Sequence, residues 1–164
     1  MSSSFDIPDV DHLTTGAVGP PGKRVFYLQA RHGAHVVSLR LEKTQIAALV
    51  AYLAGMLADM PPPGEIPSTD MDLIEPVVAE WVVASLGVTY DEDADRVVIL
   101  AEELVEEGEE AARARITATR EQVAALSVRG AEAVAAGRPP CPLCGLPLDP
   151  EGHTCPRLNG HRER

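Results

Sequence analysis

The chain has 164 residues and a formal net charge of −11, from 25 acidic and 14 basic side chains. This length allows one good hydrophobic core, or one domain with a small appendage that something other than apolar burial holds together. The negative charge repels phosphate backbones and anionic lipids, so nucleic acid is a disfavoured partner. The first thirty residues have no basic segment followed by an apolar one, and the apolar run 46–58 is too short to cross a bilayer. We therefore expect a cytoplasmic protein with no membrane partner.

The first half of the chain is predicted to form three strands and a helix. The strand-like runs HLTTGAV, RVFYLQA and HVVSLRL are separated by GPPGK and RHGA, which supply turn geometry. A helix is expected to begin at residues 42–44, with Thr44 as its N-cap. It ends before MPPPGEIP, because no helix continues through these prolines. Its predicted buried face has helical spacing and consists of Ile46, Leu49, Val50 and Leu53.

The second half repeats this order of elements. EPVVAEWVVASLGVTY turns at DEDAD into RVVILAE, and RARITA precedes a helix that Thr119 caps and that runs to about Ala136. RVFYLQA aligns with RVVILAE, and TQIAALVAYLAGM, from residue 44, aligns with EQVAALSVRGAEA, from residue 121. We therefore predict an α+β fold in which two β-β-β-α repeats form an antiparallel sheet with two helices on one face. The expected divisions are a first repeat at 1–60, a linker at 61–70, a second repeat at 71–137 and a zinc-binding tail at 138–164.

All three cysteines of the chain lie in its C-terminal tail. Cys141 and Cys144 form CPLCG, the shape of a zinc knuckle, and His153 and Cys155 follow in GHTC. These four side chains would complete a tetrahedral zinc site, with His161 as an alternative fourth ligand to His153. Such a site has no open position for water, so we expect the zinc to be structural rather than catalytic. So short a segment would fold together with its metal.

Other interpretations of these cysteines are weaker. An odd number of cysteines leaves one thiol unpaired, which makes the tail a poor disulfide framework. A redox C-x-x-C motif needs a helix start to depress the thiol pKa, and the prolines around Cys141 argue against one.

Two further motifs resemble binding loops but fail in detail. GAVGPPGKR, at 16–24, has the wrong spacing for a phosphate loop and is followed by a strand, so we interpret it as a hairpin turn. DEDADRVVILAE places acidic residues in the spacing of a calcium loop, but Arg96 stands where glycine is needed. We interpret this acidic run as the tip of a hairpin.

A third feature is the RHGAH turn, where Arg31, His32 and His35 could lie together as an anion or metal site. Exposed turn histidines are common, however, and no carboxylate lies within the turn to orient them. No nucleophile elbow, zinc-protease helix or dinucleotide glycine pattern occurs in the sequence. The sequence therefore shows no residues that would carry catalysis.

Four stretches carry a family resemblance over nearly the whole chain: RVFYLQAR, LEKTQIAAL, YDEDADRVVILAEE and above all GRPPCPLCGLPLDPEGHTCPRLNG. They resemble a family of actinobacterial proteins classified as a conserved domain of unknown function. The resemblance implies a cytosolic bacterial protein and hints at a phosphate or thiol pathway. It brings no established catalytic residues to this chain.

The closed set of zinc ligands and the missing catalytic residues favour a non-enzymatic adaptor that is stabilised by zinc and binds a protein partner. The alternative is a small enzyme or anionic-ligand sensor that uses a groove between the repeats, with Arg31, His32 and His35 near the ligand. A third hypothesis is nucleic-acid binding through the arginines of the tail, although Asp149, Glu151 and Glu163 offset most of that charge.

Overall fold

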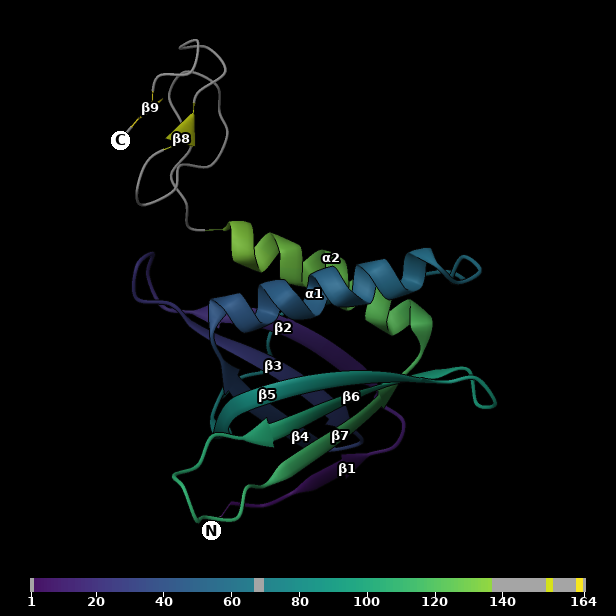
Figure 1. Ribbon diagram of the computed structural model, residues 1–164, viewed down its shortest axis with the longest axis horizontal. Helices are drawn as coiled ribbons and strands as arrows, with labels where there is room; N and C mark the ends of the chain where they lie inside the picture. Colours follow the sequence, from purple (N-terminus) through teal and green to yellow (C-terminus); the bar gives the residue numbers. More distant parts are fainter. Residues whose placement is uncertain (1, 67–69, 137–152, 155–161, 164) are drawn as a thin grey trace.

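The computed structural model describes residues 2–66, 70–136, 153–154 and 162–163. Seven strands form one mixed sheet, and two helices lie together over one side of it (Figure 1). The predicted α+β class is therefore confirmed. The order across the sheet is β1-β7-β6-β5-β4-β3-β2. The elements are β1 (Phe5–Ile7), β2 (His12–Val18), β3 (Val25–His32), β4 (His35–Leu41), α1 (Lys43–Ala58), β5 (Ala79–Asp91), β6 (Arg96–Glu103), β7 (Arg113–Ala118) and α2 (Arg120–Ala135).

The prediction of an antiparallel sheet is wrong at two pairings. β5 lies parallel to β4, with Ser38 opposite Ala79 and Arg40 opposite Val82. The reason is that α1 and the connection after it carry the chain back to the end of the sheet where β4 begins, as a parallel pair requires. The sequence analysis also missed β1, a strand of three residues that pairs parallel with β7. The other pairings within this sheet are antiparallel.

Three antiparallel strands followed by a helix occur twice, as β2-β3-β4-α1 and as β5-β6-β7-α2. The parallel β4–β5 pair joins these two halves into one sheet. Both turn interpretations hold, because residues 19–24 connect β2 to β3 and the acidic run at 92–95 connects β5 to β6.

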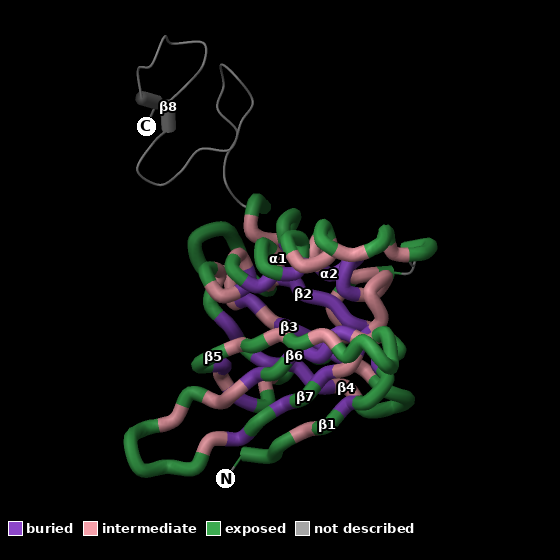
Figure 2. The backbone as a smooth tube through the Cα atoms, turned by 45° about the vertical axis from the view of Figure 1, so that its right-hand side comes forward, coloured by how far each residue is buried: buried purple, intermediate pink, exposed green. Residues whose placement is uncertain are grey.

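The hydrophobic core lies between the sheet and the helices, where Figure 2 shows buried backbone along the inner strands. Alternate residues of the strands point into it, as the pleat of a strand requires. Each fully buried aliphatic side chain contributes about 1.5–3 kcal/mol to folding. The largest of its fully buried side chains are Leu28, Val37, Leu39, Ile46, Leu53, Val97, Ile99, Ile116, Val123 and Leu126.

Both helices begin with the same polar contact. The backbone N–H of Glu42 donates to Gln45 Oε1 at 2.7 Å, and that of Thr119 donates to Gln122 Oε1 at 2.9 Å. Thr119 is the N-cap of α2, as predicted, and its hydroxyl accepts from the Gln122 backbone N–H. The predicted N-cap of α1 is wrong, since Glu42 and not Thr44 holds that position. The side chain that closes a capping box lies three residues after the cap, and Gln45 stands at that distance from Glu42.

The two helices run antiparallel and approach closely at one residue. Gly130 of α2 faces Val50 and Ile46 of α1 and Thr15 of β2. At the other end of the pair, Gly64, just beyond α1, lies beside Glu121 in the first turn of α2. α2 packs along β2, whereas α1 contacts β5 at few positions. One side of α1 is therefore left without a neighbouring element of the described part of the chain.

The connection before β5 crosses the outer face of β2 and β3, on the side of the sheet away from the helices. Gln29 donates to the carbonyl of Ile74 at 3.0 Å and accepts from its backbone N–H at 2.7 Å. The hydroxyl of Thr14, which lies opposite Gln29 in the sheet, donates to the carbonyl of Met71. These buried side chains fix the path of the connection.

No helix among the described residues is both long and apolar enough to span a membrane.

Candidate functional site

Most of the predicted zinc ligands lie outside the described residues. This applies to Cys141, Cys144 and Cys155 and to the alternative ligand His161. His153 belongs by its backbone to β8 (His153–Thr154), which pairs antiparallel with β9 (Arg162–Glu163). In the part of the chain that the structure describes, no three His, Cys, Asp or Glu side chains gather as a metal ion would require.

The histidines of the RHGAH turn lie at the tip of the β3–β4 hairpin, where His32 and His35 face one another. His32 Nδ1 lies 2.6 Å from the carbonyl oxygen of Asp9, and the ring of His35 packs at 5.7 Å from that of Phe5. The sequence analysis found no carboxylate within this turn. The structure brings one from the segment before β2, because Asp11 lies 3.7 Å from Arg31.

Asp11 ties the N-terminal segment to this hairpin. Its Oδ2 accepts from the Gly33 backbone N–H at 2.6 Å, and this bond, with His32 and Arg31 nearby, holds the pKa of the carboxyl below its usual value. The guanidinium of Arg31 is thus matched by a carboxylate. The turn residues therefore hold the segment before β2 against the β3–β4 hairpin. This structural role explains their contacts without a ligand.

His12, the first residue of β2, is partly buried, and its Nε2 has no hydrogen-bond partner among the described residues. Burial lowers the pKa of this imidazole, and Arg31 lowers it further, against smaller opposing effects of the Asp72 backbone and Asp70. The folded state therefore favours the neutral ring. A group with a lowered pKa stabilises the fold above its unfolded pKa of 6.5, and this contribution is lost as the pH falls.

We therefore expect the free energy of unfolding to decrease as the pH falls below about 6.5. His12→Asn should flatten this dependence, because asparagine does not titrate. Urea unfolding between about pH 7.5 and pH 5 measures the slope, and His35→Asn, at an exposed position, is the control. An unchanged slope in His12→Asn would contradict the assignment.

Asp95 lies in the turn between β5 and β6 and bonds one residue of β5 and one of α2. Arg120, the first residue of α2, donates to both of its carboxylate oxygens, at 2.8 and 3.3 Å, and Tyr90 donates to it at 2.5 Å. Arg120 also donates to the carbonyl of Pro61, just beyond α1. Arg120 and Tyr90 together lower the pKa of the Asp95 carboxyl. The acidic hairpin tip is therefore a structural joint between β5, α1 and α2.

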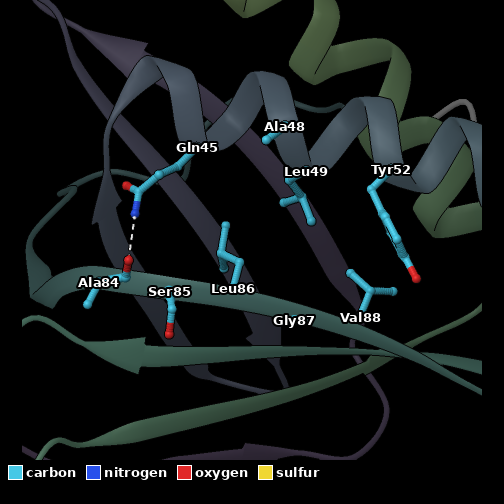
Figure 3. A pocket seen from close by; sticks show the side chains of 9 residues that line it. All are labelled: Gln45, Ala48, Leu49, Tyr52, Ala84, Ser85, Leu86, Gly87 and Val88. Atoms are coloured by element: carbon cyan, nitrogen blue, oxygen red, sulfur yellow. Dashed lines mark hydrogen bonds between the residues drawn. The ribbon is translucent and has the colours of Figure 1, made fainter.

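A groove of about 480 Å³ lies between α1 and β5 (Figure 3). A β-bulge between Val83 and Ser85 shifts the register of β5, so that Leu86 and Val88 face the helix side of the sheet. At the start of the groove, the Gln45 amide donates to the backbone carbonyls of Val83 and Ala84. The groove is lined by Gln45, Ala48, Leu49, Tyr52, Ala84, Ser85, Leu86, Gly87 and Val88.

The helix above this groove is apolar on its solvent side as well as on its buried side. After Lys43, α1 has no charged residue as far as its end at Ala58. Tyr52 is 58% exposed and also lines a second hollow with Met56 and Tyr90, whose rim carries the carboxylates of Asp59 and Glu92. We name the exposed side of α1 together with the groove the α1 face: Gln45, Ala48, Ala51, Tyr52, Gly55, Leu86 and Val88.

The composition of the α1 face suits contacts with apolar groups better than proton transfer. A helix that is apolar all round is normally covered, and a contiguous exposed apolar patch marks an interaction site. The nine lining residues include no carboxylate, imidazole, amine or guanidinium. The groove does lie between the two halves, as the enzyme alternative requires, but Arg31, His32 and His35 do not line it.

The sequence analysis interpreted the run IAALVAYLAGMLA as a helix with one buried face and as too short for a membrane span, but not as a helix with an apolar exposed side. Its lack of charge on every side of the helix is the signal that could have identified the α1 face.

Comparison with curated proteins and with solved structures found no match. A family model does match, and it covers residues 4–155, which include all described strands of the large sheet and both long helices. This confirms the resemblance to a family of unknown function. The chain thus belongs to the family described as protein of unknown function DUF3090.

Proposed function

We propose that this protein is a non-enzymatic, zinc-stabilised adaptor that binds a protein partner through its α1 face. The observation that carries the proposal is the charge-free, solvent-exposed side of α1 beside an apolar groove. An apolar helix or extended segment of a partner would bury Tyr52, Leu86 and Val88. Tyrosine suits such a site because its ring is apolar and its hydroxyl tolerates water.

The test is capture of partners from the native cell with the full-length chain as bait. We expect Tyr52→Glu to abolish capture of the specific partner, because it places a charge in the centre of the apolar surface. Leu104→Glu is the matched control, since Leu104 is 61% exposed but lies outside the α1 face. The captured protein is then purified and titrated against both variants. Equal affinity of Tyr52→Glu and the unaltered chain would refute the proposal.

The proposed zinc site consists of Cys141, Cys144, His153 and Cys155, with His161 as the alternative to His153. The spacing of these residues supports it. The four first-choice ligands lie within the residues that the family model matches, and His161 lies beyond them. A reducing cytoplasm, where we place the protein, would keep the thiols free to bind the metal.

Native mass spectrometry of the purified chain is expected to show one zinc ion per molecule. Cys144→Ser should lose the metal, because three ligands bind zinc less tightly than four. Comparing His153→Ala with His161→Ala identifies the histidine ligand, since only the ligand variant should release zinc to a chelator. A metal-free chain under reducing conditions, or full zinc occupancy in Cys144→Ser, would refute the site.

We also infer that the two halves of the body are copies of one duplicated β-β-β-α unit. The aligned sequences around Gln45 and Gln122 support this, and these two glutamines make the same contact at the start of α1 and α2.

A further inference from the structure

We propose that the partner of the α1 face carries an arginine or lysine side chain that enters the hollow at the C-terminal end of α1. The inference rests on the proposed function and adds the chemistry of the partner: an amphipathic segment that is apolar along the groove and cationic at one end. It is carried by the side chains that line this hollow, which differ in charge from those of the groove.

The hollow adjoins the groove at Tyr52, which lines both of them. It has a volume of about 760 Å³ and lies between the end of α1 and the turn that joins β5 to β6. In Figure 3, the Tyr52 ring stands at the far end of the groove from Gln45. Tyr90 supplies a second ring, and its hydroxyl donates to Asp95 at 2.5 Å. A segment that follows the groove along α1 therefore reaches the hollow next.

The hollow is negatively charged. Its lining includes the carboxylates of Asp59 and Glu92 and, among the described residues, no lysine, arginine or histidine. Neither carboxylate forms an ion pair with another described residue. The last turn of α1 has no basic side chain, so the partial negative charge of this helix end adds to that of the carboxylates. Arg120, which donates to the carbonyl of Pro61 beside the hollow, is already matched by Asp95. A cation from a partner would compensate this charge.

An organic cation suits this hollow better than a metal ion does. Tyr52 and Tyr90 line it with aromatic rings, which attract a guanidinium or ammonium group. The apolar stem of arginine or lysine can lie against Met56 while its charged end reaches the carboxylates. A metal ion needs more ligands, and the described part of the chain has no group of three His, Cys, Asp or Glu side chains that could hold one.

The length of α1 sets the size of the partner segment. Asp59 follows Gln45 by about 14 residues, which is about 21 Å at the helical rise of about 1.5 Å per residue. A partner helix of about four turns covers this distance, with apolar side chains on Leu86 and Val88 and its cation at one end. A second copy of the chain is the less suitable occupant, because two molecules with a net charge of −11 repel one another.

The experiment measures the affinity of a synthetic peptide for the full-length chain by isothermal titration calorimetry. The probe is a helical peptide of about 14 residues with leucines along one face and two arginines in its last turn. The matched peptide has citrulline, which is isosteric but uncharged, in place of both arginines. We expect the arginine peptide to bind about tenfold more tightly, because ion pairs and cation–π contacts act together in the hollow.

Variants of the chain show where the arginines bind. Asp59→Asn combined with Glu92→Gln should remove the preference for the arginine peptide, because it removes both carboxylates of the hollow. Glu106→Gln combined with Glu109→Gln is the control, since it removes the same charge from exposed positions outside the hollow and should leave the preference in place. The amide resonances of Gly55 and Asp59 should also shift when the arginine peptide is added.

Three results would overturn the inference: equal affinities of the two peptides, no binding of either, or a preference that persists in the Asp59→Asn, Glu92→Gln variant. Sedimentation velocity tests the second copy as occupant, and a stable dimer that Tyr52→Glu dissociates would also overturn it. The adaptor proposal fails separately, when Tyr52→Glu leaves the affinity for the captured partner unchanged, and that measurement uses no peptide.

Discussion

Replacing Gly130 with valine is expected to lower the free energy of unfolding by about 3 kcal/mol, because the two helices meet at this residue without room for a side chain. A Cβ atom here would overlap Val50 Cγ1 and would come within 3.4 Å of Thr15 Cγ2 and 3.5 Å of Ile46 Cγ2. Neither α1 nor β2 can move aside without opening the core. Valine on a helix is held in one rotamer, so Val50 cannot easily turn away.

Equilibrium unfolding in urea measures this effect. Gly55→Ala is the control for the loss of a helical glycine, since Gly55 of α1 faces open space. It should stabilise the protein by about 0.5–1 kcal/mol. Gly130→Ala alone should also destabilise the protein. Adding Val50→Ala should restore part of the lost stability, because it removes the methyl groups that the new Cβ would overlap. A Gly130→Val variant as stable as the unaltered chain would show that the helices are not packed this closely.

The local elements of this fold could be predicted because their signals are local. Proline and glycine mark the turn between β2 and β3, and strand-like runs match β2, β4 and β7 at both ends. Thr119 followed by Gln122 marks the start of α2 in the same way. Each of these features depends on residues within a few positions of one another, so no knowledge of the tertiary fold was needed.

The pairings between distant segments could not be predicted. β1 has only three residues, and it is a strand because β7 offers a free edge to it. The parallel direction of β5 beside β4 depends on the path of the connection after α1. Periodicity within a strand says which face is buried but not which strand lies beside it.

The α1 face could not be predicted as a groove for a similar reason. Its floor consists of Leu86 and Val88, and these face α1 because of a bulge near Ser85 that has no clear sequence signature. The charge-free surface of α1 was visible in the sequence, but its meaning depends on what covers the helix. The predicted zinc ligands are the reverse case, because the spacing that suggests them is readable without a fold.

Replacing Gln29 with alanine is expected to cost about 4 kcal/mol, because it removes a buried side chain together with the partners of both polar groups of the half-buried Ile74 backbone. Gln29 is fully buried, and its amide bonds both polar groups of Ile74 and the hydroxyl of Ser38. Each unsatisfied buried group costs about 1–3 kcal/mol.

Urea unfolding gives the total cost, and amide hydrogen exchange at Ile74 tests its origin. We expect exchange at Ile74 to accelerate in Gln29→Ala far more than exchange at core residues such as Ile99, because the connection would open locally before the sheet unfolds. Gln45→Ala is the matched control. The Gln45 amide, on α1, also bonds backbone carbonyls of another element, those of Val83 and Ala84 in β5. Gln45 is only partly buried, so its loss should cost about 1 kcal/mol. If Ile74 kept its protection, another contact would have to hold the connection to the sheet. Thr14, whose hydroxyl bonds the carbonyl of Met71, would then be the residue to replace.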